Sequence, residues 1–338
     1  MKIDTQLRDC GLDRVADEAR RLEAIGFDGL WTFESAHDPF LPLLLAVTAT
    51  TRLTVGTNIT VALARSPFVL AQTAWDLQKA SDGRFHLGVG TQVRAHVERR
   101  FSMPFDHPAA RITDYIRCVR SIWNSFQTGA RAEHDGPFYR FSLITPFFSP
   151  GPIDWPDIPV YLAGVNARMC RAAGEVADGF HVHPIHSPAY LRDVVMPAIE
   201  DGARRAGRSL EGFALYAPVL AVHGETEAER ARVEADVRRQ IAFYGSTPNY
   251  RALFEYHGHG ELARKLSQLM RAGELDAMPA LVPDTLLDAF AISGDLSALG
   301  RRLRERYAGI LSRVSLYFPV PPDDPDRRWQ EFVSDFRG

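Results

Sequence analysis

A strand, a helix and a second strand follow one another in the first third of the chain, and this succession decides the fold. The run LTVGTNI (Leu53–Ile59) is rich in β-branched residues, whereas FVLAQTAWDLQKAS (Phe68–Ser81) repeats its apolar residues at helical spacing. Asp82 and Gly83 stop the helix, and the short apolar run FHLGVG (Phe85–Gly90) follows. The stretch therefore predicts two parallel strands joined by a helical crossover.

The same alternation of strand and helix runs along the rest of the chain. Six further strands are predicted at Lys2–Gln6, Gly29–Phe33, Val160–Ala163, Gly179–His183, Phe213–His223 and Arg313–Pro319. The helices between and after them are predicted at Leu12–Ile25, Pro42–Thr50, Thr113–Phe126, Ala167–Ala177, Pro188–Ala206, Leu296–Tyr307 and Asp326–Phe336. Eight short apolar strands separated by helices, over more than about 250 residues, are typical of a (β/α)8 TIM barrel.

A doubly wound open sheet is the alternative α/β fold. It usually has five to seven strands and a Gly-x-Gly-x-x-Gly turn after its first strand. The turn after Lys2–Gln6 is LRDCG (Leu7–Gly11), without that pattern. We therefore predict an α/β protein with the TIM-barrel fold. It forms a single domain over residues 1–338, with insertions at about 127–159 and 225–281.

The second insertion, Glu225–Leu281, is predicted to be mostly helical, whereas Arg94–Arg111 is predicted to be a loop. Long insertions of a barrel either cover its mouth, where they help to select the substrate, or pack against its wall. Both roles remain open for this segment. Its aromatic and imidazole side chains are Tyr244, Tyr250, Tyr256, His257 and His259.

Composition excludes several classes of protein. The 39 Lys and Arg residues against 42 Asp and Glu residues give a net charge of −3, so no basic field is available to hold a nucleic acid. The longest apolar runs, Leu41–Val47 and Phe213–Val222, reach only about half of the roughly 20 residues that span a bilayer. Three cysteines, far apart and odd in number, fit a reducing compartment. We expect a cytoplasmic protein whose partners include neither a nucleic acid nor a membrane.

Polar residues at the carboxyl ends of the predicted strands are the candidates for chemistry, because reactive groups of TIM barrels gather there. They are Glu34, Ser35, His37 and Asp38 after the second strand, Thr57, Asn58 and Ile59 after the third, His96 after the fourth, Gly164, Val165 and Asn166 after the fifth, and His181 and His183 in the sixth. No Ser-His-Asp order, Walker loop or His-Glu-x-x-His motif accompanies them, so hydrolytic functions are weakly supported.

The turn Gly164-Val165-Asn166 leads directly into a predicted helix. Free backbone N–H groups and the positive end of the helix dipole then face the barrel mouth, which favours an anion there. Asn166 is suited to cap the helix, and Gly164 to let a ligand approach the backbone. The alternative is an ordinary strand-to-helix turn, since Gly and Asn are common in such turns whatever they bind.

His181 and His183 stand two residues apart and would share a face of the sixth strand. A zinc hydrolase could use such a pair, but His37, Asp38 and His96 form no recognisable set of further ligands. We therefore expect no metal. A hydrogen bond from His183 to a bound phosphate, with His181 lining the pocket, is the favoured interpretation.

Five strings carry a family resemblance, in order along nearly the whole chain. They are Phe27–Trp31 followed by Glu34, Val55–Ile59, Arg65-x-Pro67 with Ala71, Ser81–Phe85 leading into Gly88–Gly90, and Ala172–Phe180. Together they resemble the luciferase-like monooxygenase superfamily. Within it, Gly90–His96 with Arg99-Arg100-Phe101 is most similar to oxidoreductases that use the deazaflavin coenzyme F420.

The resemblance implies where such a coenzyme would bind. Its ring would lie against Asn58 and Ile59, next to Thr57, where F420-dependent members often have a non-prolyl cis peptide bond. Its phosphate would contact Gly164, Val165 and Asn166, with His183 near it, and His96 belongs to the same cofactor-binding set. The resemblance also implies a homodimer, and a separate F420 or flavin reductase as a possible partner.

One departure from the family pattern concerns the proton-transfer group. Relatives commonly have an acidic residue followed by histidine after the second strand, whereas this chain has Glu34-Ser35 with His37 two residues later. His37, Glu34 and Asp38 all remain candidate catalytic residues, and an imidazole pKa near about 6.5 suits the task best. A second departure lies at Val93 and His96, where the branch of the family that acts on sugar phosphates has a carboxylate and an amide. We therefore do not assume a sugar phosphate as the substrate.

The resemblance implies hydride transfer between C5 of F420 and an alcohol, carbonyl, imine or activated alkene. The nearest competing function keeps the fold and uses FMN, as a monooxygenase or a flavin reductase. A metal-dependent barrel hydrolase and a non-catalytic flavin-binding protein are less favoured.

Overall fold

The computed structural model describes residues 1–338, which separate into two compact units. The N-terminal strand, the segment after the sixth barrel strand and the C-terminal third make up the first unit. Most of the remaining chain makes up the second. Their ranges are Met1–Gln6, Val182–Pro197 and Leu215–Gly338 for the first unit, and Leu7–His181 and Ala198–Ala214 for the second.

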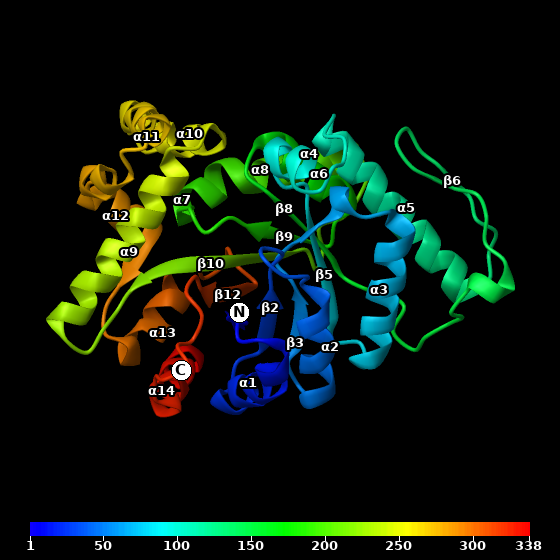
Figure 1. Ribbon diagram of the computed structural model, residues 1–338, viewed down its shortest axis with the longest axis horizontal. Coiled ribbons are helices and arrows are strands. Elements are labelled where there is room, and N and C mark those ends of the chain that lie inside the picture. Colours follow the sequence, from blue (N-terminus) through cyan, green and yellow to red (C-terminus); the bar gives the residue numbers. More distant parts are fainter. The chain divides into compact units, whose positions relative to one another are not determined.

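The second unit is built around adjacent parallel strands (Figure 1). Their order is β2 (Gly29–Thr32), β3 (Thr54–Thr57), β5 (Phe85–Gly90), β8 (Val160–Gly164) and β9 (Gly179–Val182). The longer helices of the unit are α1 (Leu12–Ile25), α2 (Phe40–Ala49), α3 (Pro67–Ala80), α5 (Pro108–Thr128), α6 (Ala167–Val176) and most of α8 (Met196–Arg205). The strands are almost wholly buried, as expected for a parallel sheet covered by helices.

Three rings fill the space between the strands of the second unit. Trp31 lies with its ring centroid 5.1 Å from that of His181 and 6.0 Å from that of Tyr161. Gly88 is required beside them, because a Cβ there would stand 1.8 Å from the Thr57 carbonyl oxygen and 2.5 Å from His181 Nε2. The barrel interior here is a packed core rather than an open channel.

The first unit has its own parallel strands, in the order β1 (Lys2–Gln6), β12 (Arg313–Leu316), β10 (Ala214–Val222) and β11 (Ala291–Ser293). Its helices are α7 (Pro188–Tyr190), α9 (Glu227–Gly245), α10 (Arg251–Tyr256), α11 (Gly260–Ala272), α12 (Asp284–Phe290), α13 (Leu296–Arg306) and α14 (Asp326–Arg337). A buried, two-pronged ion pair joins β1 to β12, with Arg313 Nε and Nη2 at 2.7 and 2.8 Å from the Asp4 carboxylate.

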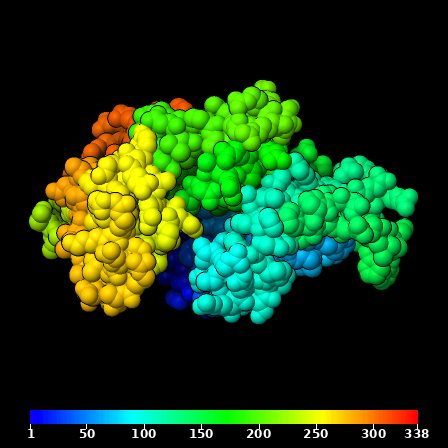
Figure 2. Space-filling model, turned by 90° about the horizontal axis from the view of Figure 1, so that it is seen from above, coloured from blue at the N-terminus to red at the C-terminus, as the bar shows by residue number.

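Along the chain, eight strands alternate with helices, and the predicted (β/α)8 TIM-barrel fold is confirmed. The expectation that Glu225–Leu281 is helical is confirmed as well, by α9, α10 and α11. Helices α10 and α11 give the yellow lobe of the first unit in Figure 2. Most predicted boundaries agree within two residues. No helix is both long enough and apolar enough to cross a membrane.

Four local predictions need correction. The strand expected at Leu53–Ile59 is shorter, because backbone bonds to the segment after β2 interrupt it, and β4 (Thr60–Val61) then pairs with β5. The helix expected over Pro188–Ala206 contains a π-turn at Leu191–Val195. We attribute that turn to Pro197, which offers no N–H to an ordinary helical hydrogen bond.

The remaining two corrections are elements that sequence periodicity did not reveal. The expected loop Arg94–Arg111 contains helix α4 (Arg94–Arg99), which forms because Val97 is buried against Val61 and Leu63. Strand β11 has only three residues, too few for an alternation to be recognised. The first insertion carries a small antiparallel pair, β6 (His134–Asp135) and β7 (Arg140–Phe141), beside α5 (Figure 1).

Candidate functional site

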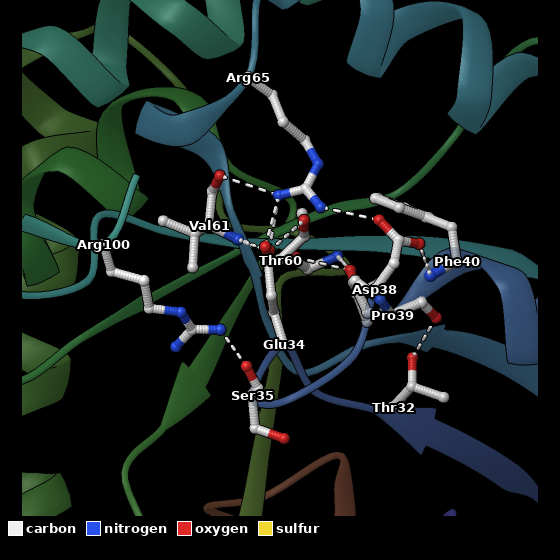
Figure 3. Close-up of polar contacts among 12 residues, drawn as sticks. Thr32, Glu34, Ser35, Asp38, Pro39, Phe40, Thr60, Val61, Arg65 and Arg100 are labelled. Atoms are coloured by element: carbon white, nitrogen blue, oxygen red, sulfur yellow. Dashed lines mark hydrogen bonds and ion pairs between the residues drawn. The ribbon is translucent and has the colours of Figure 1, made fainter. Parts of the chain in front are cut away.

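The Glu34 side chain ties the segment after β2 to the segment after β3. Its carboxylate accepts hydrogen bonds from the Val61 backbone N–H at 2.7 Å, from the Thr60 hydroxyl at 3.1 Å and from Arg65 Nη1 at 2.6 Å (Figure 3). The side chain is only 5% exposed. A buried carboxylate with this many donors fixes the position of both segments.

Arg65 extends the same network to Asp38. Its Nη2 lies 2.9 Å from one Asp38 oxygen, while the other Asp38 oxygen accepts the backbone N–H of Phe40, at the start of α2, at 2.8 Å. Burial acts to lower the pKa of Arg65, but its bonds to Glu34 and Asp38 outweigh burial and raise that pKa. Both acidic residues predicted as proton-transfer groups are thus held in ion pairs with one arginine.

The Asn58–Ile59 peptide bond is cis, which confirms the expectation drawn from the family resemblance. Its flanking atoms bond to the end of β2 and to the segment that follows it. Asn58 N–H donates to the Thr32 carbonyl at 2.6 Å, and the Ile59 carbonyl accepts the Glu34 N–H at 3.0 Å. Thr57 is fully buried, and its hydroxyl exchanges two hydrogen bonds with Gly88. Thr57 therefore anchors the loop, whereas Asn58 and Ile59 are half-buried and stay partly accessible to a ligand.

His37 differs from Glu34 and Asp38 because its imidazole is exposed. It is 76% exposed, and its Nε2 lies 3.7 Å from Asp9 Oδ2. Both residues line a half-open cavity of about 190 Å³, between the segment after β1 and the segment after β2. The sequence prediction does not include Asp9, although its place in the loop after the first strand is a usable signal.

The turn after β8 leads directly into α6, as predicted. Asn166 caps α6, because its Oδ1 accepts the backbone N–H groups of Arg168 and Met169, each at 3.1 Å. The predicted cap is confirmed. A Cβ at Gly164 would stand 2.4 Å from Met169 Cβ. Glycine is required here by the packing of the helix, whatever approaches the turn.

His96 lies on α4 and is exposed, while its neighbour Val97 holds the helix against Val61 and Leu63. The next turn of chain is fixed to the β2 loop, because Arg100 donates to the Ser35 carbonyl (Figure 3). His96 thus belongs to a segment attached to the Glu34 loop. Its role in cofactor binding stays a prediction.

The two histidines of the sixth strand have different surroundings. His181 is 1% exposed and packs against Trp31 and Tyr161, so it belongs to the core. β9 ends at Val182, so His183 lies one residue beyond the strand rather than within it. No three His, Cys, Asp or Glu side chains are grouped closely enough to hold a metal ion.

Within the first unit, the His183 ring lies against two tyrosines. Its centroid is 4.4 Å from that of Tyr244 and 4.5 Å from that of Tyr250. Its Nδ1 accepts the Ile185 backbone N–H at 3.2 Å. Burial, and then the nearby His186, lower the pKa of His183 to about 3. The ring is therefore neutral and carries its proton on Nε2.

Comparison with known proteins identifies the family. The model of the luciferase-like monooxygenase family matches residues 2–313, and the chain belongs to this family. The uncharacterised protein Rv1360 of Mycobacterium tuberculosis is 46% identical over 303 residues, covering 90% of this chain and 89% of the relative. Rv3520c of the same species, named a putative coenzyme F420-dependent oxidoreductase, is 28% identical over 324 residues, covering 90% and 91%.

Among solved structures, the coenzyme F420-dependent tetrahydromethanopterin reductase of Methanopyrus kandleri matches with a TM-score of 0.79. The match covers 99% of this chain and 97% of the reductase at 22% identity, so it supports the fold of the whole chain. The chain is an oxidoreductase of the luciferase-like family.

Proposed function

We propose that this enzyme binds coenzyme F420 and transfers a hydride between it and a small organic substrate such as an alcohol, carbonyl, imine or activated alkene. The arrangement of two segments in the second unit supports this proposal most directly. The loop after β3 is braced by Glu34, and the capped start of α6 follows β8. β5 lies between these two strands, so the two segments stand about 10 Å apart, at about 4.8 Å per strand.

That spacing suits a ligand with a flat ring at one end and a phosphate at the other. Asn58 and Ile59 would support the ring, while the backbone N–H groups at the start of α6 would hold the phosphate, with Gly164, Val165 and Asn166 shaping the turn. When bound, the deazaflavin supplies two-electron hydride chemistry at its C5 carbon. The similarity to Rv3520c, which is named for coenzyme F420, also favours this coenzyme.

His37 is the residue that we propose to move the accompanying proton, because its imidazole is exposed. Glu34 and Asp38 share Arg65, and protonating either carboxylate would break a short ion pair. Proton transfer by the His37 imidazole breaks no pair with an arginine, and Asp9 Oδ2 lies 3.7 Å from its Nε2. We assign Glu34 and Asp38 the role of positioning the loop.

A titration tests the proposal. The purified protein is mixed with F420 and, separately, with FMN, and binding is followed by the fluorescence of each coenzyme. Tight binding of F420, together with reduction or oxidation of its C5 carbon by a substrate, is the expected result. Copurification of FMN with oxygen uptake would instead support the monooxygenase implied by the family name, and binding of neither coenzyme would refute both.

The homodimer stays part of this proposal. Leu41 and Leu44 on α2 and Val69 on α3 are about half exposed, and adjacent helices with exposed apolar residues suit a contact between two copies. Light scattering measures the mass in solution. A mass near 37.8 kDa would contradict a dimer.

A further inference from the structure

In the first unit Tyr244 and Tyr250 pack against His183, and Tyr317 bonds to Tyr244; we call these three tyrosines the tyrosine cluster. Tyr244 comes from α9 and Tyr250 from the 3-10 turn Pro248–Tyr250. The ring centroids of Tyr244 and Tyr250 are 5.5 Å apart. The Tyr244 and Tyr317 hydroxyl oxygens are 3.2 Å apart. The cluster is thus one connected surface, built partly from the helical insertion.

The hydrogen bonds of the cluster have a fixed direction. The Tyr317 hydroxyl donates to Gln240 Oε1 at 3.4 Å, because an amide oxygen only accepts. The Tyr244 hydroxyl must then donate to the Tyr317 oxygen. The Tyr250 hydroxyl has no hydrogen bond within the protein, and His183 Nε2–H is directed away from the bond that occupies Nδ1. Two donors, on Tyr250 and His183, therefore remain available to a ligand.

The side chains of the cluster and His183 carry no charge. Burial raises the pKa of the Tyr244 and Tyr250 hydroxyls well above their ordinary value, and His183 is neutral. The other ring contacts and hydrogen bonds of the cluster are to Phe243, Phe318 and Gln240. None of these side chains can neutralise an anion, so a phosphate or carboxylate brought here would lose its hydration without gaining a cation.

The location is one where (β/α)8 enzymes bind their substrates. His183 directly follows β9, and Tyr317 directly follows β12. Both therefore lie at carboxyl ends of parallel strands, the end that carries the active site in this fold. His183 and the three tyrosines are all half-buried, which leaves part of each available for contact.

We propose that this surface is the substrate-recognition site and that it selects uncharged alcohols or ketones with an aromatic or alicyclic body. His183 Nε2–H and the Tyr250 hydroxyl donate to the substrate oxygen, while the rings pack against its apolar body. The proposal rests on the proposed function and adds its substrate class. It differs from the expectation that His183 contacts the cofactor phosphate, and the two assignments predict different effects of the same variant.

The test uses the complex of the full chain with F420 and two probes of nearly equal shape, acetophenone and benzoate. Titration with F420 comes first, and failure at this step refutes the proposed function by itself. With F420 bound, calorimetry is expected to give a dissociation constant for acetophenone at least tenfold lower than for benzoate. Benzoate binding as tightly as acetophenone, or no binding of acetophenone, would overturn the recognition site.

Variants of Tyr250 and His183 test which side chains contact the substrate oxygen. Tyr250→Phe and His183→Phe are expected to weaken acetophenone binding about tenfold and to leave the F420 dissociation constant unchanged, whereas His183→Gln keeps a donor near the Nε2 position and retains binding. Tyr256→Phe is the matched control, because this exposed hydroxyl bonds to Asp193 outside the cluster. A His183→Phe variant that loses F420 and keeps acetophenone would place His183 at the cofactor instead.

Discussion

Arg65 Nη1 lies 2.6 Å from Glu34 Oε2, and this ion pair joins the loops that follow β2 and β3. The relationship changes the interpretation of the acidic residues after β2. A carboxylate in that position suggests acid–base chemistry from the sequence, whereas its partners in the structure show that it holds a loop. The residues free to react or to bind a ligand are then its neighbours, His37, Asn58 and Ile59.

Replacing Arg65 tests this brace. Arg65→Met leaves the Glu34 carboxylate buried with one donor fewer, and loss of one partner of a mostly buried pair is expected to lower the free energy of unfolding by about 3 kcal/mol. Urea denaturation followed by circular dichroism measures the change. Arg94→Met is the control, because Arg94 and Glu98 are 62% and 40% exposed and their pair contributes less than about 1 kcal/mol. Equal losses in the free energy of unfolding of the two variants would show that the Arg65–Glu34 ion pair does not stabilise the loops.

Asn166→Asp separates the structural role of the cap from phosphate binding. Aspartate caps a helix as well as asparagine, so the melting temperature is expected to stay the same or rise slightly. The added negative charge repels a phosphate, so the dissociation constant of F420 is expected to rise at least tenfold. A deazaflavin without the phosphate tail is the control ligand, and its affinity is expected to remain unchanged. If Asn166→Asp weakened the binding of both ligands equally, the F420 phosphate would bind away from the start of α6.

His37→Asn tests the proton-transfer assignment. We expect turnover to fall by about 10²- to 10⁴-fold, because a general acid–base group is lost, while F420 affinity and stability stay the same. Hydride transfer to or from the deazaflavin is measured under single-turnover conditions. The companion variant His96→Asn is expected to raise the F420 dissociation constant instead. If His37→Asn kept full turnover, the proton would have to come from another group.

His186 makes the protein sensitive to acid. Burial is the main cause that lowers its pKa from 6.5 to about 4, and Arg306 adds to the effect. Below pH 6.5 the His186 imidazole is protonated in the unfolded chain, whereas in the folded chain it stays neutral until the pH approaches 4. Stability is therefore full above pH 6.5 and falls as the pH decreases toward 4, by on the order of 3 kcal/mol for this group.

His186→Asn removes that titration and keeps a donor near the position of Nδ1, which bonds to the His183 carbonyl at 2.9 Å. The free energy of unfolding, measured by urea denaturation at pH 7, 5.5 and 4.5, is expected to fall less steeply for the variant. His37→Asn serves as the comparison because His37 is exposed. A slope that does not change in His186→Asn would show that other groups dominate the acid response.

The amino-acid sequence by itself determined the order of the elements. Strands such as Phe85–Gly90 and helices such as Leu12–Ile25 are visible because apolar periodicity and local stops act between neighbouring residues. The cap at Asn166 is local in the same way, since it joins residues two and three apart. The cis peptide followed from five strings that matched a family, not from any local rule.

Only the tertiary structure decided which candidate side chains already have partners within the protein and which stay accessible to a ligand. Glu34 and Arg65 are 31 residues apart, and His183 and Tyr250 are joined only by the folding of a long insertion. Sequence spacing cannot reveal such pairs, because the energy of an ion pair or a ring contact depends on distances that the whole fold sets. Periodicity therefore predicts the scaffold, and long-range packing assigns the chemistry of each side chain.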